Sequence, residues 1–270
     1  MPTPDQTWLH ADWPVPTRFR AVMTRRAGGT SLGRWGDQHG RSGLNLGAHV
    51  GDDTGHVADN RRRLTACLPG QPRWLNQVHG TRVMVFDADD PVSGETPPPI
   101  ADAAVTRLPG VVLAVLTADC LPVALCDPQA GVIGLAHAGW RGLAAGVLEN
   151  TIHAMISQGA SATRLRTWFG VAIGPRSFEV GPEVLNAFCA GDPACEACFT
   201  AHPAHAGKFL ANLYGLAGRC LERQGVAAPL NHAHDDRCSV IDRESFYSFR
   251  RDGITGRQAT LAWMTDSVAG

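Results

Sequence analysis

Apolar residues along this chain follow two patterns, one typical of strands and one typical of helices. Alternating apolar positions at 19–23 and 82–87 predict two half-buried strands. Continuous apolar runs at 111–116, 122–126 and 132–136 are separated by Gly and Asp-Pro signals. Such runs are typical of central strands covered on both faces. The middle of the chain is therefore expected to form the core of a sheet.

Helical spacing dominates the sequence after these runs. Apolar residues recur at intervals of three and four over 143–158, and Gly159 follows, which predicts a helix that ends there. A strand is expected at about 167–173. Two further helices are predicted over 182–189 and 209–224. Because strands and helices are interleaved, the pattern favours an α/β (α+β) fold.

A single domain spanning 1–270 is the expected organisation. The hydrophobic content of 44% is enough to build a substantial core in a chain of 270 residues. The proline-rich stretch 89–99 is interpreted as a long exposed loop and not as a domain boundary, because candidate functional residues lie on both sides of it.

Charge and termini restrict the classes of partner. The chain has 24 Lys and Arg against 25 Asp and Glu, a formal charge of −1, so no basic footprint for nucleic acid or an anionic membrane is expected. No apolar stretch is long enough to span a bilayer, and the segment 1–5 lacks the features of a signal peptide. A cytoplasmic protein with a small-molecule ligand is the expectation.

Eight cysteines are present, and reduced thiols are expected in the cytosol. Cys195 and Cys198 form the only C-x-x-C pair, but no second ligand pair accompanies them, which disfavours a redox or zinc role there. The His-rich segment 231–236 has suitable ligand types, but its expected surface position favours adventitious metal binding.

Two histidines and one cysteine are the strongest candidates for chemistry. His79, Cys120 and His137 occur at the ends of apolar runs and beside glycines, where side chains can converge on a cleft. Three protein ligands leave one tetrahedral position of zinc open, as in catalytic sites. Each residue also has an ordinary interpretation as a loop histidine, a buried core thiol or a strand-capping histidine. Spacing alone leaves both interpretations open.

Sequence motifs decide between them. The chain resembles the YfiH-like laccase-domain family over about residues 19–263, which is nearly its whole length. The motifs that carry the resemblance are N-Q-V-H-G at 76–80, T-A-D-C-L-P-V at 117–123, H-A-G-W-R-G at 137–142, I-G-P at 173–175, F-Y-S-F-R-R-D-G at 246–253 and T-G-R at 255–257.

The resemblance implies a layered sandwich of mixed β-sheets flanked by helices. It also implies that His79, Cys120 and His137 bind zinc at the catalytic centre. Members of the family were first described as multicopper polyphenol oxidases. They are now regarded as zinc-dependent purine nucleoside phosphorylases with adenosine deaminase and methylthioadenosine phosphorylase activities. Cys238 falls where the family has a cysteine, and its role stays open.

Residues beside the three ligands are candidates for supporting roles. One of the two residues Gln77 and Asp119 is expected to hydrogen-bond a ligand imidazole or a bound hydroxyl, with a plain turn as the alternative for Asp119. Asp119 is therefore included among the catalytic candidates. The Arg141 guanidinium suits bidentate binding of phosphate, and a surface ion pair is the alternative.

Three further residues are candidate substrate contacts. Asn45 lies in the loop-forming segment 42–47, which supplies backbone donors. Tyr247 and Arg250 lie in the aromatic and basic tail 246–251, where an aromatic face can stack on a purine. Core packing is the alternative for the aromatic residues.

The expected function is a phosphorylase that cleaves adenosine, inosine and methylthioadenosine to the free base and (methylthio)ribose 1-phosphate, with adenosine deaminase activity. Its partners would be a purine nucleoside and phosphate, and the chain would be a monomer or a homodimer. A copper-dependent, laccase-like polyphenol oxidase is the first alternative, although it needs more His ligands than converge here. A metal-free hydrolase with a Cys120–His137 pair is the second.

Overall fold

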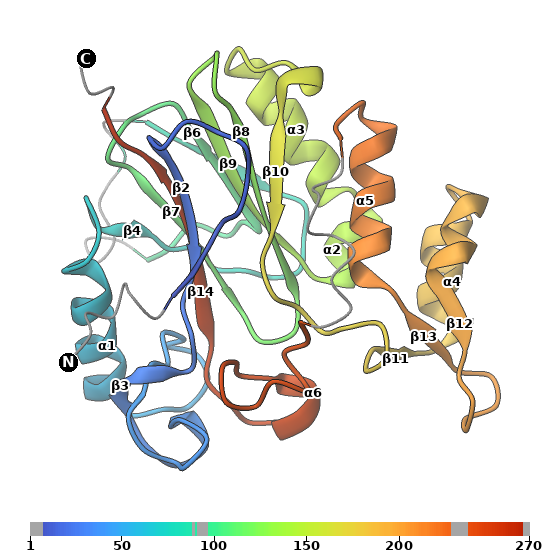
Figure 1. The fold of residues 1–270 in the computed structure, drawn as a ribbon, viewed down its shortest axis with the longest axis horizontal. Helices are drawn as coiled ribbons and strands as arrows, with labels where there is room; N and C mark the ends of the chain where they lie inside the picture. Colours follow the sequence, from blue (N-terminus) through green and yellow to red (C-terminus); the bar gives the residue numbers. More distant parts are fainter. Residues whose placement is uncertain (1–7, 88–89, 91–96, 228–236, 267–270) are drawn as a thin grey trace.

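A computed structural model of the chain describes residues 8–87, 90, 97–227 and 237–266. It is a single-domain α/β structure in which two five-stranded sheets pack face to face (Figure 1). The expected layered arrangement of mixed sheets and flanking helices is confirmed. Most of segment 89–99 and the whole of 231–236 lie outside the described residues.

The first sheet contains the last strand of the described chain beside the second. Its order is β1-β2-β14-β7-β4, with β4 parallel to β7 and the other pairs antiparallel. The strands of this sheet are β1 (Leu9–His10), β2 (Phe19–Met23), β14 (Gln258–Met264), β7 (Val112–Thr117) and β4 (Pro72–Arg73).

The second sheet has the order β10-β8-β9-β6-β5, and only its β5–β6 pair is parallel. Its strands are β10 (Arg166–Phe169), β8 (Leu121–Asp127), β9 (Val132–Ala138), β6 (Ala103–Thr106) and β5 (Val83–Phe86). A smaller antiparallel sheet is formed by β11 (Glu179–Val180), β13 (Phe209–Ala211) and β12 (Phe199–Ala201). The short strand β3 (Ala27–Ser31) lies outside these sheets.

The expectation that the central strands are covered on both faces is confirmed. All seven residues of β8 are buried. Val123 and Leu125 pack into the layer with the helices, whereas Ala124 and Cys126 pack between the two sheets. Since successive side chains of a strand point to opposite faces, two apolar environments produce the continuous apolar run seen in the sequence.

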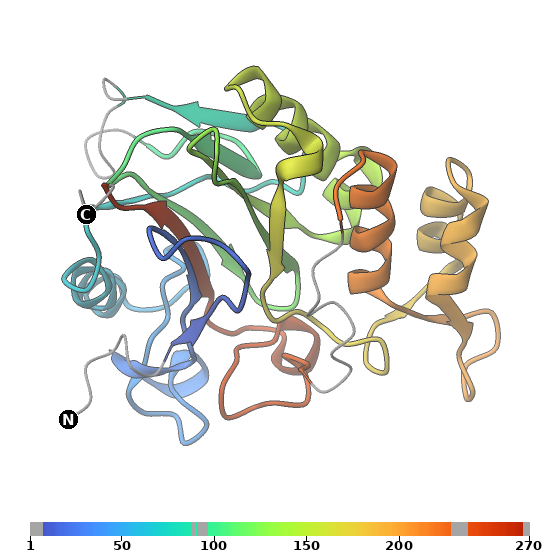
Figure 2. The ribbon, with the colours of Figure 1, turned by 45° about the horizontal axis from the view of Figure 1, so that its top comes forward.

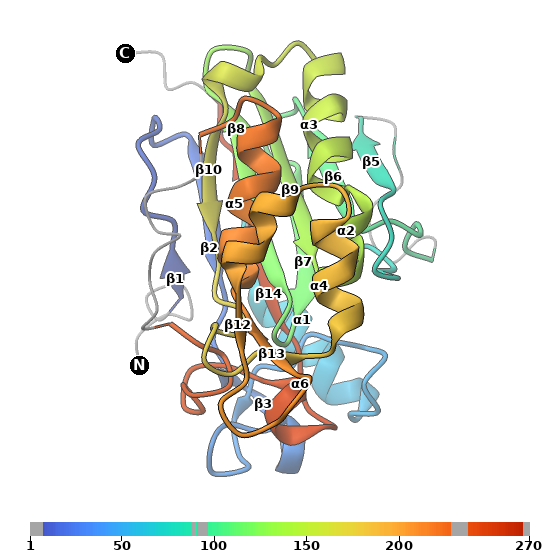
Figure 3. The ribbon, with the colours of Figure 1, turned by 90° about the vertical axis from the view of Figure 1, so that its right-hand side faces the viewer.

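Helices cover the outer faces of both sheets. On one side, α1 (Thr54–Thr65) begins at Asp53, whose side chain accepts the N–H groups of Gly55 and His56. On the other side lie α2 (Trp140–Ala145), α3 (Val147–Ser157) and α5 (Leu213–Arg223), and α4 (Pro182–Cys189) lies beyond α5 beside the small sheet (Figures 1, 2 and 3). The short helix α6 (Phe249–Asp252) precedes β14. Among the described helices, none combines the length and apolar character that a bilayer crossing needs.

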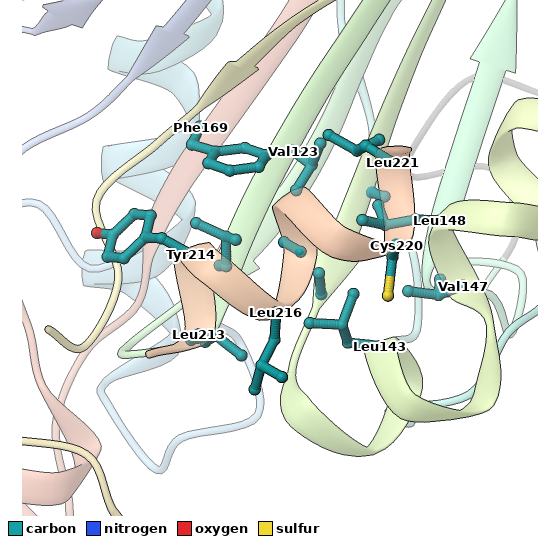
Figure 4. Packing of buried hydrophobic residues seen from close by; sticks show 14 of the residues in the cluster. Val123, Leu143, Val147, Leu148, Phe169, Leu213, Tyr214, Leu216, Cys220 and Leu221 are labelled. Atoms are coloured by element: carbon teal, nitrogen blue, oxygen red, sulfur yellow. The ribbon is translucent and has the colours of Figure 1, made fainter. Parts of the chain in front are cut away.

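The apolar side of α5 shows how the helical layer is held. Leu213, Leu216 and Leu221 point from this helix toward the second sheet and toward α2 and α3 (Figure 4). All three side chains are at most 1% exposed. Truncating one leucine in such a core to alanine typically costs about 2–5 kcal/mol of folding free energy.

Two helix predictions need correction. The helix expected at 143–158 is interrupted by Gly146, which has φ of 102° and ends α2 before α3 begins. Glycine adopts this left-handed conformation without the penalty that a Cβ atom would bring. The helix expected at 209–224 begins only at Leu213, because 209–211 pair as a strand with β11 and β12. Helix α4, in contrast, has the predicted bounds.

The strand expected at 167–173 is shorter than predicted. It ends at Phe169, which pairs with Val123 of β8, because the next residue of β8 is Pro122, which has no backbone N–H to donate to the ladder. The following backbone is fixed by single bonds instead, from the N–H of Gly170 to the Pro122 carbonyl and from the N–H of Ile173 to the Asp119 carbonyl. This deviation brings the chain beside the turn that precedes Cys120.

Candidate metal centre and adjoining cavities

Three segments from different elements bring His79, Cys120 and His137 together. His79 lies in the loop before β5, Cys120 in the turn between β7 and β8, and His137 near the end of β9. Their nearest ligand atoms all lie within 4.8 Å of one another. The sulfur of Cys120 is 3.6 Å from Nε2 of His79, and the two imidazole rings meet edge to face at 4.8 Å.

The backbone at this centre adopts conformations that few residues tolerate. His79 and Asp119 have φ of 60° and 95°, which non-glycine residues rarely adopt outside functional or tightly constrained sites. Gly139 provides the space between the ligands, because a Cβ atom there would lie 2.7 Å from the His79 ring and 3.0 Å from the Cys120 sulfur. The glycines beside the ligands are therefore needed for close approach.

Asp102 is the residue that orients the ligands, and the sequence-based assignment missed it. Its fully buried carboxylate accepts the Nδ1 proton of His137 at 2.9 Å and the backbone N–H groups of Val78, His79 and Gly80. One side chain thus fixes both the His137 ring and the His79 loop. A carboxylate behind a ligand histidine is the usual outer partner in metal sites. The sequence offered one signal for this role, because Asp102 directly precedes the apolar run 103–105.

Neither Gln77 nor Asp119 hydrogen-bonds an imidazole of the centre in the described part of the chain, and Asp119 occupies the turn that was its alternative interpretation. The Gln77 amide exchanges two hydrogen bonds with the backbone of Leu116, at 2.9 and 2.8 Å, and so fastens the His79 loop to β7. The Asp119 carboxylate accepts the Ser239 hydroxyl and the backbone N–H of Arg250, both at 2.6 Å. Both residues hold the backbone that carries the ligands, and Gln77 also lines the cleft described below.

Charges within the centre favour a deprotonated thiol. Burial by itself raises the pKa of Cys120, but the His137 charge and hydrogen bonds from both histidines outweigh it and lower the pKa. Burial likewise lowers the pKa of His137, whereas Cys120 and Asp102 together raise it. The Cys120 thiol therefore loses its proton more easily than an ordinary buried cysteine, as a thiolate ligand requires.

The three ligand atoms fit zinc. Thiolate sulfur and imidazole nitrogen are common zinc ligands, and three protein ligands leave a position for substrate. The described residues contain one other group with metal-ligand atoms in reach of each other, Glu179, His202 and His205. Cys195 and Cys198 belong to neither group.

A cleft of about 540 Å³ opens on the three ligands. Arg141, Arg257 and His49 line it, and only Arg141 of these was expected to do so. The Arg141 guanidinium lies over the Trp140 ring at 4.4 Å. Within the described parts of the chain, neither arginine forms an ion pair with a carboxylate. Burial and the charges of Arg257 and Arg61 lower the pKa of His49, which marks this wall as cationic.

A second cavity of about 170 Å³ also adjoins Cys120. Phe249 lines both cavities and is 58% exposed. Arg250, an expected substrate contact, lines the second cavity together with Phe178. The two cavities therefore share the candidate metal ligand Cys120 and the side chain of Phe249.

Asn45 and Tyr247 are not among the residues that line either cavity. Both are fully buried, and each hydrogen-bonds backbone groups of a neighbouring loop. Asn45 accepts the backbone N–H of Arg257 at 2.8 Å, which positions that cleft residue. The Tyr247 hydroxyl donates to the carbonyls of Trp35 and Arg26. In this arrangement any effect of Asn45 and Tyr247 on substrate is exerted through the backbone they hold.

Cys238 lies near the same region without facing the ligands. Its buried sulfur accepts the backbone N–H of Gly174 at 3.1 Å and donates to Ser177. Gly174 permits this contact, since a Cβ atom there would lie 3.0 Å from that of Cys238. The Cys238 thiol therefore stabilises the turn of the I-G-P motif at 173–175.

Comparison with known proteins covers nearly the whole chain. The chain is 44% identical over 259 residues to a purine nucleoside phosphorylase of Pseudomonas aeruginosa, covering 96% of this chain and 99% of that one. It is 42% identical over 254 residues to the purine nucleoside phosphorylase YfiH of Escherichia coli, covering 93% and 96%. Among solved structures, a Neisseria meningitidis protein matches with a TM-score of 0.82 and 41% identity, over 96% of this chain and 100% of that one.

The sequence pattern of a whole family also matches. The pattern described as multi-copper polyphenol oxidoreductase laccase matches residues 20–265. That range contains all three ligands and both cavities. The chain therefore belongs to this laccase-domain family, whose YfiH-named members are among its relatives.

Proposed function

We propose that this protein is a zinc-dependent purine nucleoside phosphorylase. It would cleave adenosine, inosine and methylthioadenosine to the free base and (methylthio)ribose 1-phosphate, and it would also deaminate adenosine. Relatives named purine nucleoside phosphorylase support this proposal, because they align with the chain from end to end. The observation that carries it is an open set of three zinc-type ligands in a cleft lined by two arginines without carboxylate partners.

His79, Cys120 and His137 would hold the zinc ion. When bound, zinc supplies Lewis-acid chemistry, since it polarises an oxygen and stabilises negative charge that develops there. Asp102 keeps the His137 proton on Nδ1, so that Nε2 presents its lone pair to the centre. The same carboxylate holds the His79 loop through three backbone N–H groups, which keeps the ligand set preorganised.

Arg141 and Arg257 would bind the phosphate co-substrate. Guanidinium groups match phosphate oxygens with pairs of parallel N–H donors. Arg257 is half-buried, and burial lowers its pKa, so the folded protein incurs a desolvation cost for this cation. An anion in the cleft would offset that cost. The absence of ion pairs at both arginines, within the described residues, supports this role.

Two other functions remain as alternatives with specific support. A copper-dependent polyphenol oxidase agrees with the description of the family pattern. It would need further His ligands, and only His79 and His137 converge with Cys120 in the described centre. A metal-free hydrolase is favoured by the lowered pKa of Cys120 beside His137, which is the arrangement of an activated thiol nucleophile.

Anaerobic turnover by zinc-loaded, copper-free protein tests the proposal. We expect inosine and phosphate to give hypoxanthine and ribose 1-phosphate without oxygen, because zinc has no redox step. Cys120→Ala should abolish this reaction. The control variant Cys67→Ala should retain it, because Cys67 lies just after the C-terminus of α1 and does not line either cavity. Absence of turnover together with copper-dependent oxygen uptake on phenols would favour the oxidase. Turnover of an ester or amide by metal-free protein would favour the hydrolase.

The phosphate role of Arg141 has its own test. Arg141→Lys retains the positive charge but loses the paired N–H donors of the planar guanidinium. The rate of phosphorolysis should therefore fall by roughly 10-fold or more, while the rate of deamination changes less. Product analysis with adenosine, in the presence and absence of phosphate, separates the two reactions. Equal losses in both reactions would show that Arg141 supports the fold or the metal centre instead.

A further inference from the structure

The second cavity beside Cys120 differs in chemistry from the cationic cleft. Its walls are mainly apolar and come from the start of α2, the start of α5, α6 and the loop 170–178. Ile173, Phe178 and Leu213 are at most 6% exposed, so they form a fixed wall. Figure 4 shows Leu213 at the beginning of α5, beside the helical layer that holds it. A preformed apolar cavity of this kind suits a planar ring and not an anion.

Aromatic side chains line two parts of this cavity. Phe178 forms part of the buried wall, and Phe249 forms the exposed side that both cavities share. Stacking of a nucleobase on such a ring is worth about a 10-fold change in affinity or more. Because Cys120 also lines both cavities, a nucleoside can place its base in one and its sugar beside the metal centre.

Arg250 supplies the polar side of the same cavity. Its backbone N–H donates to Asp119 at 2.6 Å, and one guanidinium nitrogen donates to the carbonyl of Glu179 at 2.9 Å. The guanidinium lies 5.6 Å from the Phe178 ring centre. In the described parts of the chain it forms no ion pair, so most of its five N–H donors are available.

We propose that this cavity binds the purine base of the nucleoside and that Arg250 selects 6-oxopurines, with donors to O6 and N7. The inference rests on the proposed function and goes further by assigning a base site and a preference. A guanidinium pairs with the adjacent acceptors O6 and N7 of a 6-oxopurine. Adenine presents an amino donor at position 6, which faces the guanidinium donors without an acceptor. Hypoxanthine and guanine should therefore bind more tightly than adenine.

Equilibrium binding of free bases to the zinc-loaded full chain tests this without turnover. Arg250→Met should weaken hypoxanthine binding on the order of 10-fold or more, while adenine binding changes less than about 2-fold. Arg250→Lys should lose as much for hypoxanthine, because an ammonium lacks the fork, yet it can still donate to Glu179. Arg166→Met is the matched control, since Arg166 also donates to backbone carbonyls but lies on β10. It should leave both affinities unchanged.

Kinetic selectivity provides the second readout. In Arg250→Met the ratio of kcat/KM for inosine over adenosine should fall by the same factor as hypoxanthine affinity. Equal changes for both bases, or wild-type selectivity in Arg250→Lys, would overturn the inference and leave the proposed function intact. A selective loss of methylthioadenosine over adenosine would also overturn it, because the cavity would then hold the 5′ substituent. Base selectivity in binding without any phosphorolysis would remove only the proposed function.

Discussion

Two groups of possible metal ligands in the described part of this protein are alike in the spacing of their ligand atoms but differ in their surrounding contacts. His79, Cys120 and His137 form one group, and Glu179, His202 and His205 form the other. In each, the ligand atoms lie within 4.8 Å of one another. The first group is assembled from three separate segments beside a cleft, whereas two members of the second lie in one hairpin turn.

The hydrogen bonds behind the imidazoles separate the two groups. His137 donates Nδ1–H to Asp102, which leaves the lone pair of Nε2 for a metal. His202 instead accepts two backbone N–H groups at Nδ1, from Ala204 at 3.1 Å and His205 at 3.0 Å. A neutral imidazole then carries its proton on Nε2, which faces Glu179 at 3.3 Å.

Exposure points in the same direction. The His137 side chain is 3% exposed, whereas that of His205 is 59% exposed. The comparison teaches that ligand types at suitable distances are not sufficient, because the outer partner decides which nitrogen is free. The second group is therefore best described as two imidazoles that donate to one carboxylate.

Removing a ligand from each group should give the largest contrast. Cys120→Ala should lower zinc affinity because only two protein ligands remain. The loss should be far larger than the roughly 10- to 100-fold loss expected when an outer hydrogen-bond partner is removed. His202→Ala should keep the zinc content of the wild type. Elemental analysis after dialysis against a chelator measures both. Full zinc content in Cys120→Ala, or a reduced content in His202→Ala, would contradict the distinction.

Replacing the outer carboxylate should have a smaller effect. Asp102→Asn should lower zinc affinity by about 10- to 100-fold, since the amide cannot accept both the His137 proton and three backbone N–H groups. Asp127→Asn is the matched control. Asp127 is equally buried and accepts backbone N–H groups and Arg164, but it lies at the opposite end of β8.

Chelator competition and thermal denaturation distinguish these two variants. Both should lower the melting temperature, because each leaves buried N–H donors without a good acceptor. Only Asp102→Asn should change zinc affinity. An unchanged zinc affinity in Asp102→Asn would show that the His137 ring is held by packing alone.

The smallest effect is expected at Glu179. The hydrogen bond from His205 lowers the pKa of this carboxyl below its usual value. A lowered folded-state pKa means that the ionised group stabilises the fold above the unfolded-state pKa, and that this contribution is lost as pH falls through the folded-state pKa. Glu179→Gln should therefore reduce Tm by about 2 °C or less at pH 7 and by nothing in strong acid.

Scanning calorimetry from pH 7 down to pH 3 checks this trend. A difference in Tm that is the same at every pH would show that ionisation of Glu179 plays no part. A zinc-dependent rise in Tm that disappears in Glu179→Gln would instead make the second group a metal site.

Local pattern was sufficient for most of the central sheet. The buried runs at 111–116, 122–126 and 132–136 correspond to β7, β8 and β9 within two residues at each end. Helix α4 was predicted with its observed bounds, since Pro182 at its first position is a local signal. These features depend on side-chain alternation and on backbone restrictions, which are properties of neighbouring residues.

The ligand set was predicted because its motifs are long and adjoin glycines. Asp102 was missed because its role depends on β6 lying beside β9, so that its carboxylate reaches both the His137 ring and the His79 loop. The side-chain partners of Gln77 and Asp119 could not be predicted for the same reason. Proximity in sequence placed them beside ligands, but their side chains bond to Leu116, Ser239 and Arg250 instead.

The sequence by itself therefore determined the α/β class and the central strands, and through its family resemblance it predicted His79, Cys120 and His137 as zinc ligands. Only the tertiary structure decided which carboxylate orients them, which arginines face the cleft and that a second cavity adjoins Cys120. Arg257 and Phe249 come more than a hundred residues after Cys120 and reach it through the pairing of β14 with β7. Contacts between distant segments arise from packing of whole sheets, and no local periodicity records them.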